Sequence, residues 1–433
     1  MTTSASRWIV FLLAALTLRS TPARAAVLYE DELGGKSTAL TLLVRSFSFL
    51  LTGPTLKPPI SPSDMDPTAT TITDLRLSFV QKLPWLKIVL HDQLTTTVRA
   101  HSSTDALSIG RGVPPPRFLP LQQNIVSEGN LQLRNSIDWL YLAFTFGPVT
   151  LTVGRQPITL GRGKLWQVTD LIAGFSITEV DTEYKPGSDA FRLDWQIAQK
   201  SQLTLLAVAG ELADDKDAQA TLRGSSFALR FQQGFKKGEV GVLAGFIRRD
   251  VVLAVDLALD FGAFDMYVEV SATLPTHDSL TRRSAPLSSD SRVLVRGVLG
   301  ATFKPTGKLT IVPELYFNGM GSWKPSEYLF VAGSERLSIG EFYNMGRFYV
   351  GCAVNWEVHA LVTINGALMM NLRDPSALIS AGVTYNLAQN VSLFGGLYVP
   401  IGRRPLANGL IPEPKSEFGL YPYFFFLMLK AAI

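Results

Sequence analysis

Apolar and polar residues alternate with a period of two along much of this chain. In residues 188–200, Phe191 and Trp195 share one face of an extended segment, while Arg192 and Asp194 share the other. This period is typical of β-strands whose two faces meet different surroundings. The same alternation recurs in residues 224–234, 251–261, 264–270, 309–318 and 379–387.

The connections between the predicted strands differ in length in a regular way. Short turns fall at every second connection, and most of the others are long. The long connections are 53–69, 101–130, 160–187, 213–221, 277–290, 321–340 and 403–416, with short exceptions at 248–250 and 372–375. A soluble sandwich also alternates, but short turns on one side and long loops on the other are typical of a barrel in the outer membrane.

We therefore predict an all-β fold, a transmembrane antiparallel β-barrel of about eighteen strands. Sixteen strands would result if the weakest segments, 201–212 and 239–250, merged with their neighbours. The turns would be periplasmic and the long loops extracellular. A barrel of this size is expected to enclose a polar, water-filled lumen. Aromatic residues in or beside the predicted strands are expected to favour the membrane interface: Trp85, Trp139, Tyr141, Trp195, Tyr316, Phe348, Trp356, Tyr385 and Tyr398.

The N-terminus is typical of a secretory signal peptide. Arg7 precedes an apolar run from Trp8 to Leu18, which is too short to span a bilayer as a helix, and small residues surround Ala25. We expect residues 1–25 to be cleaved and residues 26–433 to form the barrel domain. Export of this kind implies the outer membrane of a Gram-negative bacterium.

Composition and charge exclude several other classes of protein. Beyond the signal peptide, no apolar run approaches the roughly 20 residues of a membrane helix. Removal of Arg7, Arg19 and Arg24 leaves 37 basic residues against 36 acidic ones, so the net charge falls from +4 to +1 and gives no support for nucleic-acid binding. The chain has one cysteine and four scattered histidines. We expect neither a metal site nor a cofactor.

Over the whole mature length, the chain resembles the porin-type outer-membrane barrels of Gram-negative bacteria. Within that class, LTVGRQPITLGRG (151–163) is similar to the strand-and-loop region of the eighteen-stranded alginate-export-type barrels. The resemblance implies a channel for polar or anionic solutes, and more narrowly the export of an acidic polysaccharide. It implies contact with outer-membrane lipid, and periplasmic export proteins as possible partners.

The candidate site is a charged segment around the connection 160–187, which is long enough to fold into the lumen. Its candidate lumen or constriction residues are Arg155, Arg162, Lys164, Glu179, Asp181, Glu183 and Arg192. Further inward-facing charges on the predicted strands are mixed in sign: Arg230, Arg292 and Arg296 against Asp194, Asp256, Asp260, Asp265, Glu269 and Glu314. Such charges would set a local field that selects solutes. The alternative is a solvated surface loop.

Two other functions stay open. The barrel could be a scaffold that anchors periplasmic or surface partners, with a plugged lumen. It could also be an outer-membrane enzyme, but the sequence has no G-x-S-x-G motif, and the adjacent pair His101-Ser102 lies in a long loop. We therefore predict no catalytic residues.

Overall fold

The computed structural model describes most of residues 26–433, and the expected signal peptide, 1–25, lies outside the described residues. The described residues are 26–31, 34–54, 64–100, 115–176, 178–180, 182–210, 224–248, 250–275, 293–405 and 413–432. In these ranges twenty β-strands form one sheet.

The strands are β1 (Ala26–Asp31), β2 (Lys36–Pro54), β3 (Asp64–Lys82), β4 (Leu86–Arg99), β5 (Gln122–Glu128), β6 (Leu131–Phe146), β7 (Val149–Gln156), β8 (Ser188–Ala198), β9 (Ser201–Val208), β10 (Ser226–Phe235), β11 (Gly238–Ile247), β12 (Asp250–Asp260), β13 (Phe264–Leu274), β14 (Leu294–Thr306), β15 (Leu309–Asn318), β16 (Phe348–His359), β17 (Val362–Asn371), β18 (Ser376–Ala388), β19 (Val391–Ile401) and β20 (Tyr423–Ala432). The short helices are η1 (Pro325–Glu327), α3 (Tyr328–Ala332), α4 (Glu335–Ser338) and η2 (Phe418–Leu420).

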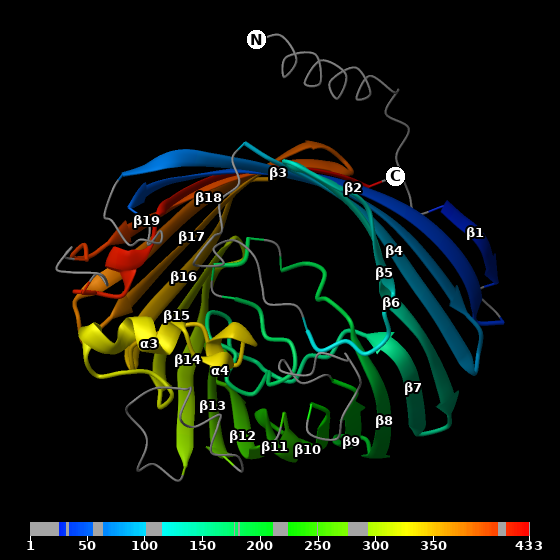
Figure 1. The fold of residues 1–433 in the computed structure, drawn as a ribbon. Helices are drawn as coiled ribbons and strands as arrows, with labels where there is room; N and C mark the ends of the chain where they lie inside the picture. The colour runs from blue at the N-terminus through cyan, green and yellow to red at the C-terminus, as the bar shows by residue number, and fades with distance from the viewer. Residues whose placement is uncertain are drawn as a thin grey trace.

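Eighteen of these strands, β2–β4 and β6–β20, close into an antiparallel barrel (Figure 1). Each strand pairs with the next, and β20 pairs with β2 from Leu43↔Ala432 to Thr52↔Tyr423. Closure lets each strand hydrogen-bond its backbone N–H and C=O groups to neighbouring strands. This is necessary because the hydrocarbon of a bilayer offers no hydrogen-bond partners. The prediction of eighteen strands is confirmed, and the two weak segments form the separate strands β9 and β11.

Two short strands lie outside the barrel sequence and were not predicted. β1 pairs with residues 36–40 of β2, whereas β20 pairs with residues 43–52 of the same strand. β5 pairs with residues 131–136 of β6, beyond the reach of β7. The prediction of a loop over 101–130 was therefore wrong for β5. Each of these two strands pairs with backbone N–H and C=O groups along a part of β2 or β6 that the next barrel strand does not cover. Without such a partner, those groups would form an exposed strand edge.

The lengths of the connections agree with the prediction. Turns such as 83–85, 147–148 and 236–237 join strands at one end, and the long connections lie at the other end. Two boundaries were wrong. β2 and β3 have 19 residues each and extend into the predicted loop 53–69. The connection predicted as 403–416 continues to residue 422, because residues 418–420 form η2 before β20 begins at Tyr423.

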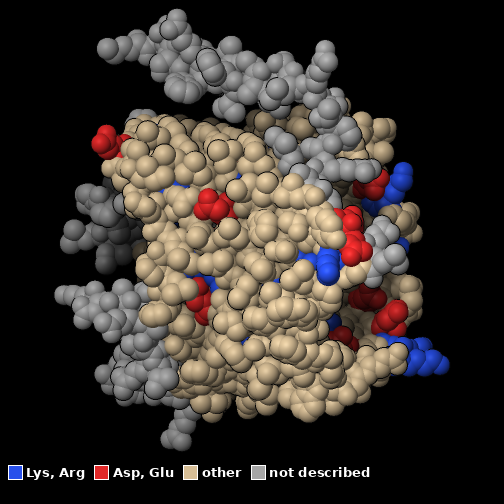
Figure 2. Space-filling model, turned by 90° about the vertical axis from the view of Figure 1, so that its right-hand side faces the viewer, with Lys and Arg blue, Asp and Glu red and all other residues tan. Residues whose placement is uncertain are grey.

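The outer face of the barrel is apolar. On β12, Leu253 and Val255 are 52% and 48% exposed, whereas the inward Val252 and Ala254 are 2% and 3% exposed. In Figure 2, charged residues are sparse over the middle of the visible outer face and gather towards one edge. This arrangement fits a lipid-facing surface. Within the described ranges, no helix is both long and apolar enough to cross a membrane.

Aromatic residues divide between the outer face and the interior. Trp85, Trp195 and Trp356 are exposed at or beside the short turns, as a girdle at the membrane interface requires. In contrast, Tyr316 and Tyr398 are buried and face the interior. The expectation of an interface position was therefore wrong for these two.

The core of the protein lies inside the barrel. The connection between β7 and β8 crosses the interior of the ring (Figure 1). Residues of the connections 157–187, 319–347 and 402–422 pack against inward-facing side chains in two apolar clusters. We expected a polar, water-filled lumen into which the connection 160–187 could fold. Apolar side chains of three connections also pack inside the barrel, so part of the interior is a packed core.

A charge on the outer face should be costly. We expect Val255→Arg, near the middle of β12, to lower the free energy of unfolding by about 2–4 kcal/mol. The matched control is Ala258→Arg on the inward face, where the cross-strand partner is Glu239, and it should cost much less. Urea unfolding in lipid bilayers measures both, and equal losses would contradict the proposed orientation of the strand.

Candidate functional site

The connection 157–187 is fixed to the inner wall by a buried carboxylate on β13. Glu269, 0% exposed, accepts the backbone N–H of Gly163 at 2.7 Å and that of Thr169 at 2.9 Å. It also accepts the N–H of Arg162 and the Thr169 hydroxyl. Hydrogen bonds to a charged acceptor are among the strongest in proteins. One wall residue therefore holds the loop at two places, residues 162–163 and residue 169.

A second carboxylate, Glu314 on β15, binds the next three backbone N–H groups. It accepts from Lys164 at 2.6 Å, from Leu165 at 3.1 Å and from Trp166 at 3.0 Å. Tyr267 on β13 donates its hydroxyl to the same carboxylate. Successive N–H groups that converge on one point form an anion-binding concavity. Here the bound anion is a side chain of the wall.

Two arginines link the loop to a third wall carboxylate, Asp256 on β12. Arg162 donates from Nε to Asp256 at 2.5 Å, and Arg230 on β10 donates from Nη2 to the other oxygen at 2.9 Å. Arg162 also bonds to Glu239, and Arg230 also donates to the carbonyl of Leu160. Asp256 is therefore shared between a loop arginine and a wall arginine.

Apolar packing supports these polar contacts. Ile158, Leu160, Leu171 and Ile172 of the loop are at most 6% exposed. They pack against Ala190, Leu206, Val208, Leu243, Ile247, Val252 and Ala254 of the wall. Burial of such side chains stabilises the docked loop, because each removes apolar surface from water.

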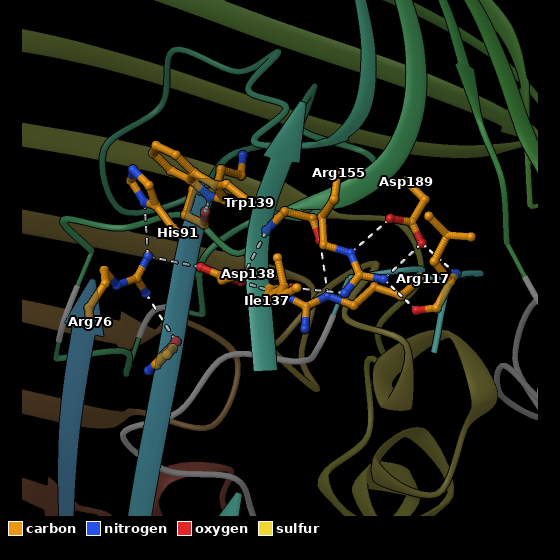
Figure 3. A network of polar contacts seen from close by, with 12 residues as sticks. Arg76, His91, Arg117, Ile137, Asp138, Trp139, Arg155 and Asp189 are labelled. Atoms are coloured by element: carbon orange, nitrogen blue, oxygen red, sulfur yellow. Dashed lines mark hydrogen bonds and ion pairs between the residues drawn. The ribbon is translucent and has the colours of Figure 1, made fainter. Parts of the chain in front are cut away.

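A second network holds the two ends of the loop (Figure 3). Arg155 on β7 donates to both oxygens of Asp189 on β8, at 2.8 and 2.9 Å. It also donates to the carbonyls of Ile137 and Leu119. Asp189 in turn accepts the backbone N–H of Phe118 and Leu119. The pair therefore joins the barrel wall to residues 115–121.

Asp138 on β6 is the centre of the other half of Figure 3. Arg76 on β3 donates to one oxygen at 3.0 Å, and Arg117 donates to the other at 2.5 Å. Arg117 also donates to the carbonyl of Gly187 at the end of the loop. The ring of His91 stacks on Trp139, with centroids 4.2 Å apart. Both ends of the loop are thus tied to β6 and its neighbours.

The connection 319–347, which carries α3 and α4, docks beside the first loop. Arg336 donates to Asp250 at 2.5 Å and to Glu341 at 2.7 Å. Arg248, in the turn between β11 and β12, donates to the carbonyls of Ile339 and Ile172. Arg248 thereby contacts both connections. Its backbone φ of 45° is uncommon for a residue other than glycine and marks a site held by its surroundings.

The structure brings three of the predicted site residues into these networks and places the others that it describes apart from them. Arg155, Arg162 and Arg230 bind carboxylates of the wall, Arg192 pairs with Asp194, and Glu183 pairs with Lys430. Glu179 accepts a backbone N–H within the loop. Lys164 is exposed, and Arg296 is 2% exposed. Asp181 and Arg292 lie outside the described residues.

Sequence reasoning did not predict the anchoring role of Glu269 and Glu314, nor the roles of Asp138, Arg117 and Arg336. The alternation of β13 and β15 does place both glutamates on the inner face. Most of their partners in the loop are backbone N–H groups. Every residue except proline has such a group, so the loop sequence does not reveal these contacts. Among the described residues, no group of three or more His, Cys, Asp or Glu could hold a metal ion.

Comparison with known proteins adds the class of fold. No protein-family model and no curated protein match the sequence. Acinetobacter baumannii OccAB4 has a TM-score of 0.52 and 9% identity, over 94% of this chain and 100% of that one. Pseudomonas aeruginosa outer membrane protein OprD has a TM-score of 0.54 and 9% identity, over 95% of both chains.

A BenF-like porin from Pseudomonas fluorescens has a TM-score of 0.52 and 8% identity, over 92% of this chain and 98% of that one. Identities this low show a shared fold alone. The chain therefore has the fold of the outer-membrane porins. These structures do not support the narrower resemblance to alginate-export-type barrels.

Loss of one partner of the Arg155–Asp189 pair should be strongly destabilising. We expect Arg155→Gln or Asp189→Asn to lower the free energy of unfolding by about 3–5 kcal/mol, because either leaves an uncompensated buried charge. The double variant should lose less than the sum of the single variants, which urea unfolding of the four proteins measures. Additive losses would contradict direct coupling.

Stability should also depend on pH through Glu341, which lies between β15 and β16. Burial raises its pKa, but the guanidinium groups of Arg336 and Arg296 outweigh this effect and lower the pKa below its ordinary value. A lowered folded pKa stabilises the protein above the unfolded pKa of about 4.3, and the contribution is lost as the pH falls through the folded value.

We therefore expect Glu341→Gln to be less stable than the unsubstituted protein near pH 7, and the difference to shrink as the pH falls below about 4. Urea midpoints measured across this range test the expectation. A difference that does not change with pH would contradict it.

Proposed function

We propose that this protein is an outer-membrane channel for small polar solutes, with a preference for anions. The observation that carries the proposal is a long charged loop bound along the inner wall of a closed barrel by Glu269, Glu314 and Asp256. A loop held there narrows the path and places fixed charges beside it. The likeness in fold to the porins supports the same function.

A small set of charges is available to a solute. Lys164 on the loop is exposed, and its ammonium has no hydrogen bond or ion pair among the described residues. The side chain of Arg162 is 25% exposed. On the wall, Arg192 is 27% exposed and faces Asp194. We propose that Lys164, Arg162 and Arg192 guide an anionic group by charge-assisted contacts.

Two alternatives differ in what they require of the lumen. Export of an acidic polysaccharide needs a path wide enough for a sugar chain, and the apolar packing of three connections inside the barrel favours smaller solutes. A scaffold needs no path at all. We also propose that residues 1–25 direct export to the periplasm, from which the barrel reaches the outer membrane.

The test is single-channel conductance of the purified barrel in planar bilayers. The double variant Glu269→Gln with Glu314→Gln weakens charge-assisted hydrogen bonds that contribute about 1.5–3 kcal/mol each. We expect larger conductance and more current noise than in the unsubstituted protein, because the loop leaves the wall. A short anionic solute should block the unsubstituted channel more strongly than a neutral solute of equal size.

Asp194→Asn is the matched control, because the partners of Asp194 among the described residues are the wall side chains Arg192, Gln202 and Thr204. It should leave the noise unchanged. A barrel that never conducts would overturn the channel and favour the scaffold. Blockade by an acidic oligosaccharide, but not by small anions, would favour polysaccharide export.

A further inference from the structure

Arg296 on the inner face of β14 is buried without a full set of partners. It is 2% exposed, and its Nη1 donates to the backbone carbonyl of Glu341. Its Nε and Nη2 atoms have no hydrogen-bond partner within the described part of the chain. A guanidinium carries five N–H donors and no acceptor. Most of its donor capacity is therefore unused.

Two hydroxyl groups beside Arg296 are in the same condition. Ser271 on β13 is its direct cross-strand partner, and Thr273 lies two residues further along β13. Both are 0% exposed, and neither hydroxyl has a partner among the residues described. Side chains directly opposite each other on one face of a sheet have Cβ atoms about 4.5–5.5 Å apart. Four unpaired polar atoms thus gather at one place on the wall.

The neighbouring carboxylates do not complete this site. The Glu341 carboxylate accepts its hydrogen bond from Arg336, and Arg296 acts on it as a nearby charge without donating to it. Glu269, two residues before Ser271 on the same face, is occupied by the loop donors described above. The Tyr316 hydroxyl oxygen accepts from the guanidinium, which leaves its O–H able to donate. The hydroxyl groups here can also accept, so water can complete their hydrogen bonds. An anion accepts from every group and in addition balances the positive charge of the guanidinium, which water does not.

We propose that Arg296, Ser271 and Thr273 bind one small inorganic anion of the size of chloride. A bound anion completes the hydrogen bonds of a buried cation, for which unpaired burial is costly. Because Arg296 also holds the carbonyl of Glu341, the anion fixes the position of the connection 319–347 on the wall. This site differs from the proposed solute path, since its residues are at most 2% exposed.

The first test is crystallography with bromide in place of chloride. An anomalous bromine peak within hydrogen-bond distance of Arg296 Nη2 and Ser271 Oγ is expected. Density without an anomalous signal would identify water and overturn the proposal. Absence of density at the site would overturn it as well.

The second test is thermal unfolding in chloride compared with gluconate, an anion too large for a buried site, at constant ionic strength. The melting temperature of the unsubstituted protein should rise with chloride concentration. This rise should be lost in Arg296→Gln and reduced in Ser271→Ala and Thr273→Val. The hydroxyl variants keep the test decisive if the arginine variant does not fold.

The matched control is Arg45→Gln, which alters an arginine of β2 that already has a carboxylate partner, Asp74, and that has no part in the proposed solute path. It should retain the full response to chloride. An equal response in all variants, or no response in the unsubstituted protein, would overturn the proposal. Failure of the barrel to conduct would leave this site unaffected, so the two proposals are tested separately.

Discussion

The interior of this barrel depends on hydrogen bonds between wall carboxylates and loop backbone. Glu269 and Glu314 are almost fully buried, and their charges would be very costly without partners. The loop has the converse problem, because its N–H groups need acceptors once it leaves water. Each group satisfies the other. The loop cannot leave the wall without breaking these charge-assisted hydrogen bonds, and this requirement fixes its path.

The same arrangement holds the other connections. Asp189 accepts the backbone N–H groups of residues 118 and 119, and Glu417 accepts that of Met345 at 2.9 Å and the side-chain amide of Asn371 at 2.7 Å. Once these contacts fix the backbone, aromatic side chains from separate connections fill the remaining space. The protein therefore has a core in the usual sense, and the core lies where a plain barrel would hold water.

The strands were predictable from sequence because each face of a strand stays in the same kind of environment along its length. On β12 the apolar residues of the outer face alternate with Asp250, Val252 and Asp256, and period two records this directly. For the charged loop, the sequence indicated only that it is long enough to fold into the lumen, with a solvated surface loop as the alternative. Its contacts were not predictable, because Glu314 binds backbone atoms about 150 residues away in sequence. β5 was not predicted because it pairs with a part of β6 that β7 is too short to cover. The length of β7 decides which part of β6 is left uncovered.

The charges that could select solutes are fewer than the sequence suggests. Arg155, Arg230 and Arg296 face inwards, but each is at most 7% exposed, so each acts mainly on the protein around it. A field calculated from all inward arginines would therefore overstate the attraction for anions, because paired and buried charges largely cancel at a distance. The attraction that remains comes from charged side chains that are exposed. Lys164 lies on a loop whose position depends on Glu314, so the selectivity of the proposed channel would depend on a buried carboxylate as well as on the exposed ammonium.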